Sequence, residues 1–257
     1  MLVTTIATNL LKPKRWAVAF SKLRSRFGRR NSKYEASKAV QWCSDQASSM
    51  DEFLKKLDCD LYDETMEFSK QLKEKSDRKL RKLEFEMGGG GSAELLYFLT
   101  RLCKPMFCVE TGVAAGHSST AILSALRKNE KGMLFSSDLP YFRIDDPENY
   151  IGILVEEELM DRWVLTTDGD EKNLSHLPKQ FNEIDLLHYD SDKYYEGRER
   201  VFNHLHSMLS HGSSVIMDDI QDNLFFMDYV SKIGKEYKVF QYERKYIGII
   251  MNENNHP

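Results

Sequence analysis

The chain has 257 residues, a formal net charge of −4, 41% hydrophobic residues and 30% charged residues. This composition is typical of a soluble globular protein, and the length allows one large α/β domain with an additional segment. The first 34 residues carry nine lysines and arginines and no acid, so the remainder is acidic, which argues against nucleic acid as the main partner. The four cysteines lack metal-site spacing and no apolar run is long enough to cross a membrane, so we expect a cytoplasmic protein.

Residues 1–35 form a basic arm with interleaved apolar side chains. Three interpretations remain open: an amphipathic helix on an anionic membrane surface, a cleavable transit peptide, or a solvated arm that packs on the body. Residues 36–87 place apolar residues three or four positions apart in a polar background. This spacing predicts a helical extension, which would cover a cleft or support a homodimer contact.

Four consecutive glycines at positions 88–91 mark the sharpest change in composition. We place a domain boundary here, so that the main domain comprises residues 88–257. The glycine run is either a flexible hinge or a stretch of bare backbone that lies against a ligand. Ser92 follows it and predicts the N-cap of a helix over 93–102.

The most informative segment is residues 107–126, where a short apolar run is followed by two glycines four residues apart and then by a second apolar run. This pattern predicts a strand, a tight turn and a helix, which is the opening unit of a nucleotide-binding α/β fold. Gly112 permits the turn and Gly116 a close approach of the backbone. Ser118 or Ser119 is expected to cap the helix.

The composition of this turn also indicates the ligand. Ala114 stands where a dinucleotide-binding motif has its middle glycine. Glu110 places a carboxylate at the end of the strand, where it would repel a phosphate but could pair with an amine or a sulfonium. The turn therefore favours S-adenosylmethionine (SAM) over NAD.

Acidic residues follow the later predicted strands. Asp138 ends a strand over 132–138, one helix and one strand beyond the glycine turn, where an acid can accept hydrogen bonds from ribose hydroxyls. The strands around 184–189 and 213–217 are each followed by further acids. Acids gathered at one edge of a sheet repel one another unless a cation relieves them, and carboxylates suit Mg²⁺, Mn²⁺ or Ca²⁺. Residues 238–251 predict a closing hairpin.

The segment Glu110-x-Gly112-x-x-x-Gly116 resembles the class I SAM-dependent methyltransferases. The resemblance implies a Rossmann-like, doubly wound, seven-stranded mixed sheet, with this turn and Ser118 around the methionine part of the cofactor. It also implies that an acid after the third strand accepts a hydrogen bond from the adenine amine. Asp168 or Asp170 could do so, and a plain turn is an equal alternative.

The later acids resemble those of the metal-dependent O-methyltransferases of the catechol and macrocin types, in an uncharacterised bacterial subgroup. The resemblance implies that Asp190, Asp218 and Asp219 hold Mg²⁺, with Asp190 also beside the cofactor and in the catalytic site. It implies that Lys193, three residues after Asp190, is the catalytic base, as in the catechol branch; the sugar-modifying branch has a histidine there. His188 is expected to be structural.

We therefore predict a SAM-dependent O-methyltransferase, assisted by a divalent cation, that methylates a hydroxyl of a sugar or another small metabolite. One alternative is an enzyme of the same fold that lacks the metal. Another is a non-catalytic SAM-binding or scaffold protein whose basic arm docks on a membrane or a partner. An NAD-linked oxidoreductase is disfavoured by Ala114 and Glu110.

Overall fold

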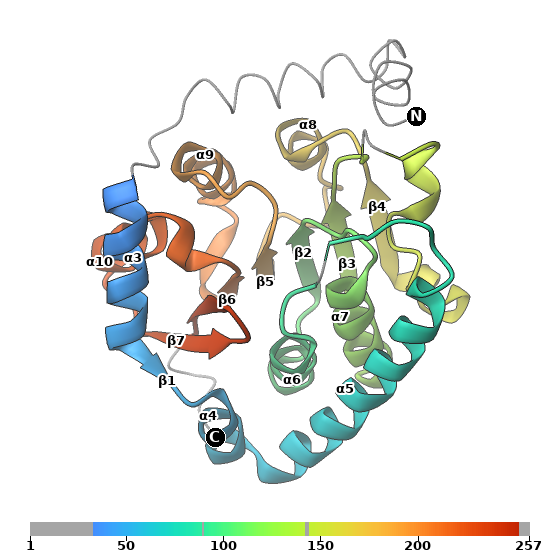
Figure 1. Cartoon of the computed structure of the whole chain (residues 1–257), viewed down its shortest axis with the longest axis horizontal. Coiled ribbons are helices and arrows are strands. Elements are labelled where there is room, and N and C mark those ends of the chain that lie inside the picture. Colours follow the sequence, from blue (N-terminus) through green and yellow to red (C-terminus); the bar gives the residue numbers. More distant parts are fainter. Residues whose placement is uncertain (1–32, 89, 142–143, 252–257) are drawn as a thin grey trace.

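The computed structural model describes residues 33–88, 90–141 and 144–251 (Figure 1). The basic arm predicted over residues 1–35 therefore lies almost entirely outside the described residues, and so do the interpretations attached to it.

The described strands form one eight-stranded mixed sheet in the order β1-β7-β8-β6-β5-β2-β3-β4. Strand β8 runs antiparallel to β6 and β7, and the other neighbouring strands are parallel. The predicted Rossmann-like sheet is confirmed; the strand beyond the expected seven is the two-residue β1, which comes from the N-terminal extension and pairs with β7. The strands are β1 Ala47–Ser48, β2 Phe107–Thr111, β3 Met133–Ser137, β4 Trp163–Thr166, β5 Ile184–Tyr189, β6 Leu209–Met217, β7 Tyr237–Tyr242 and β8 Lys245–Ile250.

Helices cover both faces of this sheet. Two hydrophobic clusters form, one with side chains of α4 to α7 and the other with side chains of α3 and α8 to α10. Along β2, Cys108 belongs to the first cluster and Val109 to the second, because successive side chains of a strand point to opposite faces. The α-helices are α3 Lys33–Gln46, α4 Met50–Leu57, α5 Cys59–Leu80, α6 Ala93–Cys103, α7 His117–Lys128, α8 Asp170–Ser175, α9 Tyr195–Leu205 and α10 Phe225–Ile233, and the 3₁₀ helices are η2 Pro147–Tyr150, η3 Glu157–Arg162 and η4 Ile220–Asp222.

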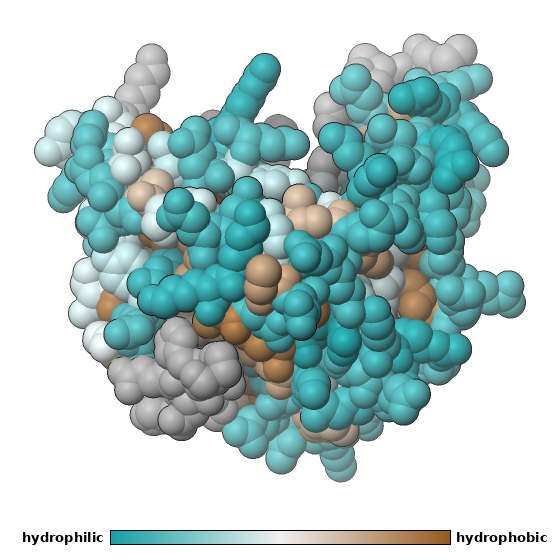
Figure 2. Space-filling view, turned by 90° about the horizontal axis from the view of Figure 1, so that it is seen from below, coloured by the Kyte–Doolittle hydropathy of each residue, from teal (hydrophilic) through white to brown (hydrophobic). Residues whose placement is uncertain are grey.

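The helical extension packs on the main domain. Leu54 of α4 and Leu72 of α5 lie in the same cluster as Leu96 of α6, and the rings of Phe68 and Tyr97 stack with centroids 4.0 Å apart. Figure 2 shows the side of the molecule on which α4 and α5 lie; it is mainly hydrophilic, with hydrophobic residues in a limited band. Among the described helices, none is both long enough and apolar enough to span a membrane.

Two helix starts test the capping predictions. Ser92 caps α6 as predicted: its hydroxyl accepts a hydrogen bond from the Leu95 amide at 3.2 Å. The prediction for α7 is wrong, because the helix begins at His117 and its N-cap is Gly116, with φ +95°. Ser118 and Ser119 therefore lie inside the first turn of α7 instead of before it.

Candidate functional site

A cavity of about 980 Å³ opens at the carboxyl ends of β2, β3, β5 and β6. This is the edge where open α/β sheets bind ligands, and the volume is in the range of small-molecule sites. The cavity brings together most of the residues predicted from the sequence. Its walls include Gly88, Gly112, Ala114, Ser118, Asp138, Asp170, Asp190, Lys193, His204, Asp219 and Lys245.

Gly112 allows the turn after β2 to lie directly on the chain after β5. Its φ is +86°, and a Cβ built there would lie 2.3 Å from the carbonyl oxygen of Asp190. A side chain would therefore both strain the turn and push the two strand ends apart. Gly116 is similarly tight, because a Cβ there would lie 2.9 Å from the Cα of Gly152. Gly116 supports the turn and does not itself line the cavity.

We expect the substitution Gly112→Ala to destabilise the fold by more than about 1 kcal/mol, because alanine is strained at this φ and the clash with Asp190 adds to that strain. Gly234→Ala is the matched control: Gly234 has φ +64° but no atom within 4 Å of its built Cβ. Urea unfolding of both variants measures the difference. Equal losses for the two variants would show that the contact with Asp190 contributes nothing.

Asp138 closes the glycine turn from the end of β3. Its carboxylate accepts hydrogen bonds from the amides of Val113 at 3.1 Å, Ala114 at 2.7 Å and Leu139 at 2.6 Å. Burial raises the pKa of the Asp138 carboxyl, and the three amide donors oppose this shift. Oδ2 accepts from both Val113 and Ala114, whereas Oδ1 accepts from Leu139 alone, so the second lone pair of Oδ1 remains for a ligand in the cavity.

Only one of the two acids predicted after β4 lines the cavity. Asp170 lines it and accepts hydrogen bonds from the hydroxyls of Ser137 at 2.6 Å and Ser191 at 2.5 Å. Burial raises the pKa of Asp170 to about 6. Asp168 is exposed and forms an ion pair with Lys172 at 2.9 Å. The structure therefore leaves Asp170, and not Asp168, in position to contact a ligand.

The raised pKa of Asp170 predicts a pH-dependent loss of stability. Between the ordinary value of 3.8 and about 6 the folded protein binds more protons at this group than the unfolded chain does. Its contribution therefore falls as the pH rises through this window, by up to roughly 3 kcal/mol. We expect Asp170→Asn to flatten the pH dependence of the unfolding free energy between pH 4 and 7, measured in urea. Asp168→Asn is the control, and equal curves for both variants would contradict the prediction.

Glu110 is not placed as predicted. Its side chain is fully buried and is not part of the cavity wall. Its carboxylate accepts hydrogen bonds from the hydroxyls of Ser119 at 2.5 Å and Ser136 at 2.7 Å, and it pairs with Nδ1 of His188 at 3.3 Å. The prediction of a direct contact with the cofactor is therefore wrong, because neighbouring elements already satisfy this carboxylate. Ser118, by contrast, lines the cavity.

Two lysines compensate the acids at the ends of β5 and β6. The ammonium of Lys193 contacts the carboxylate of Asp190 and that of Asp219, the latter at 2.6 Å. The ammonium of Lys245 lies 2.6 Å from Asp218. Burial lowers the pKa of Lys193, but the ion pairs with Asp190 and Asp219 outweigh it, so the pKa is raised. A lysine must lose its own proton before it can act as a base, so the raised pKa of Lys193 limits the predicted role to the small neutral fraction at neutral pH.

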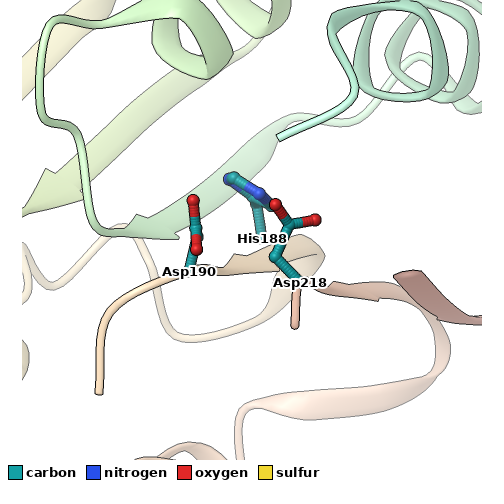
Figure 3. A group of neighbouring side chains, drawn as sticks. All are labelled: His188, Asp190 and Asp218. Atoms are coloured by element: carbon teal, nitrogen blue, oxygen red, sulfur yellow. The ribbon is translucent and has the colours of Figure 1, made fainter. Parts of the chain in front are cut away.

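His188 joins the acids, which the sequence interpretation missed. His188, Asp190 and Asp218 each offer a ligand atom, and these atoms lie within 4.8 Å of one another (Figure 3). The available signal was strand periodicity: residues two apart on one strand point to the same side, and His188 precedes Asp190 by two. Asp219, predicted as the third metal ligand, is not part of this group.

This trio passes a test of fit for a divalent cation. Nε2 of His188 and Oδ1 of Asp218 are buried and have no hydrogen-bond partner in the described structure. A Cβ built on Gly91 would lie 3.0 Å from Nε2 of His188 and 3.3 Å from Oδ1 of Asp218, so the glycine leaves space beside both atoms. Imidazole nitrogen and carboxylate oxygen are both common ligands of divalent metals. The residues that fit a cation are therefore His188, Asp190 and Asp218, while Asp219 is held by Lys193.

A Rossmann-like sheet with a glycine turn and strand-end acids around one cavity is the fold of methyltransferases. A family model described as a methyltransferase domain matches residues 109–220, which includes the glycine turn and both acidic strand ends. This match agrees with the predicted resemblance to methyltransferases. No curated protein matches the sequence.

Solved structures share this fold at low sequence identity. An O-methyltransferase from Bacillus cereus, in complex with SAH, is 13% identical with a TM-score of 0.52, and the match covers 82% of this chain and 100% of that one. The O-methyltransferase TomG from Streptomyces achromogenes, involved in tomaymycin synthesis and solved with SAM, is 14% identical with a TM-score of 0.51, covering 70% and 89%. A methyltransferase from Geobacter sulfurreducens is 15% identical with a TM-score of 0.52, covering 71% and 89%. At these identities the likeness establishes the fold alone.

Proposed function

We propose that the protein transfers the methyl group of SAM to a hydroxyl of a sugar or another small metabolite, with the assistance of a divalent cation. One observation carries the proposal: the glycine turn, Asp138 and the Lys193–acid cluster line the same cavity. The SAM-bound and SAH-bound O-methyltransferases of the same fold support it.

The chain's own residues suggest how the cofactor is held. The turn at Gly112 and Ala114 would pack against the methionine part, and Asp138 would accept from the ribose hydroxyls. Asp170, ionised above about pH 6, would accept from the adenine amine. Bound SAM supplies an electrophilic methyl group on a sulfonium, and holding it in line with the acceptor oxygen contributes much of the rate.

The remaining residues of the cavity would act on the acceptor. Asp190 in the cavity wall and the buried Asp218 next to it would hold a cation, which would supply Lewis acidity that lowers the hydroxyl pKa. In the proposal the neutral form of Lys193 accepts the hydroxyl proton at its Nζ. The ion pairs with Asp190 and Asp219 make this neutral form rare at neutral pH. Lys245, which pairs with Asp218, also lines the cavity on this side.

We also propose, as predicted from the sequence, that the protein is cytoplasmic, forms a homodimer, has no nucleic-acid partner and contacts a membrane through its basic arm. A non-catalytic SAM-binding protein is the second candidate, favoured by the raised pKa of Lys193, since a protonated lysine cannot act as a base.

Incubation with methyl-labelled SAM and a panel of catechols, sugars and other hydroxylated metabolites separates the two candidates. The enzyme is expected to form SAH and a singly methylated acceptor in equal amounts, detected by mass spectrometry. SAM binding without SAH formation, with Mg²⁺ and with Mn²⁺ present, would overturn the proposal and support the non-catalytic protein.

A further inference from the structure

The environment of His188 prepares one ring nitrogen for a cation. The side chain is fully buried on β5, and its Nδ1 lies 3.3 Å from a carboxylate oxygen of the equally buried Glu110. The second carboxylate oxygen of Glu110 accepts from Ser119 and Ser136, which fixes its position. When Nδ1–H donates to a carboxylate, Nε2 carries the free lone pair, and metal-binding histidines are typically oriented in this way.

In the neutral tautomer that donates Nδ1–H to Glu110, the lone pair on Nε2 of His188 meets a second acceptor without a partner. Oδ1 of Asp218 is buried without a hydrogen-bond partner, while its Oδ2 accepts from Lys245 at 2.6 Å. In Figure 3 the imidazole edge of His188 faces this carboxylate, and Asp190 lies to one side. Two buried lone-pair atoms that face each other are unfavourable unless a cation or a shared proton lies between them.

Gly91 leaves the space that such a cation needs. A Cβ there would lie 3.0 Å from Nε2 of His188 and 3.1 Å from the nearer oxygen of Asp218, so any other residue would fill the gap. The neighbouring carbonyl of Gly90 accepts from Lys245 at 3.3 Å, which holds Gly90 and Gly91 over the site. The position of Gly91 supports the interpretation that bare backbone lies against a ligand here.

We propose that His188, Asp190 and Asp218 bind a first-row transition-metal dication such as Mn²⁺ or Zn²⁺ in preference to Mg²⁺. The donor set is one imidazole nitrogen and two carboxylates, and the nitrogen favours the transition metals, whereas Mg²⁺ favours oxygen ligands alone. The site differs from the set implied by the family resemblance, in which Asp219 is the third ligand and Mg²⁺ the ion. The proposal rests on the proposed function in one respect: it identifies the divalent cation that assists methyl transfer there.

Metal titration of the full-length protein without SAM or acceptor tests this proposal separately from methyl transfer. Calorimetry with Mn²⁺ and with Mg²⁺ is expected to show at least tenfold tighter binding of Mn²⁺. Pulsed electron paramagnetic resonance of the Mn²⁺ complex is expected to show coupling to one imidazole ¹⁴N. Both His188→Gln and Gly91→Ala should weaken Mn²⁺ binding at least tenfold, and the first should also abolish the nitrogen coupling.

His204→Gln is the matched control, because His204 lines the same cavity but is outside the trio and should leave both readouts unchanged. Thermal unfolding checks that each variant is folded. If His188→Gln does not fold, Gly91→Ala still tests the site. Absence of Mn²⁺ binding, which would indicate a shared proton, or Mn²⁺ binding without nitrogen coupling would overturn the proposal. Failure of SAM to bind would leave it unaffected and would instead count against the proposed function.

Discussion

Replacing Lys193 with methionine is expected to lower the rate of methyl transfer by about 10²–10⁴-fold, with little change in SAM affinity. The Nζ of Lys193 lies in the cavity between the carboxylates of Asp190 and Asp219, and methionine has no group that can exchange a proton. The measurement is SAH formation at saturating SAM. The control is Lys172→Met, which removes an exposed lysine that pairs with Asp168 and does not line the cavity.

The pH profile tests the role of Lys193 further. Because the ion pairs outweigh burial and raise its pKa, the neutral form is scarce at pH 7 and increases about tenfold per pH unit. The logarithm of kcat should therefore rise with a slope near one between pH 7 and 9, and the slope should vanish in Lys193→Met. A flat profile for the unmodified enzyme, or an equal loss in Lys172→Met, would exclude Lys193 as the base.

The second large effect is expected for Glu110→Ala, which should lower the unfolding free energy by roughly 3–5 kcal/mol. The substitution leaves a cavity in the core and removes the buried partner of Ser119, Ser136 and His188. Guanidinium chloride unfolding measures the loss. The control is Glu64→Ala, because Glu64 also has three partners but remains partly exposed.

A loss for Glu110→Ala no larger than that for Glu64→Ala would contradict this account of the network. It would mean that the contacts of Glu110 with Ser119, Ser136 and His188 do not stabilise the fold more than the partly exposed contacts of Glu64 do.

The backbone of the site could be predicted from the sequence. The apolar run of β2 and the glycines after it predict a strand and a turn from local chemistry alone. Parallel strands bring their carboxyl ends to one edge, so Asp138, Asp190 and Asp219 were expected near the turn, and all three line the cavity with it.

Side-chain partners could not be predicted in the same way, because they depend on elements far apart in the chain. Glu110 was expected to face the cofactor, but Ser119 of α7 and Ser136 of β3 satisfy it inside the core. Lys245 carries no motif, and it reaches Asp218 only because β8 pairs with β6. The pairing of β1 with β7 could not be predicted for the same reason, because Ala47 and Val239 are neighbours in the sheet but far apart in the sequence.

Calorimetric titration of the purified protein with SAM is the most direct test of the central claim. We expect binding in the low micromolar range or tighter, no comparable binding of NAD, and loss of SAM binding in Asp138→Ala. Asp168→Ala should bind normally, because Asp168 is exposed outside the cavity wall. Absence of SAM binding to the unmodified protein, with and without Mn²⁺, would contradict the account and leave the fold without this function.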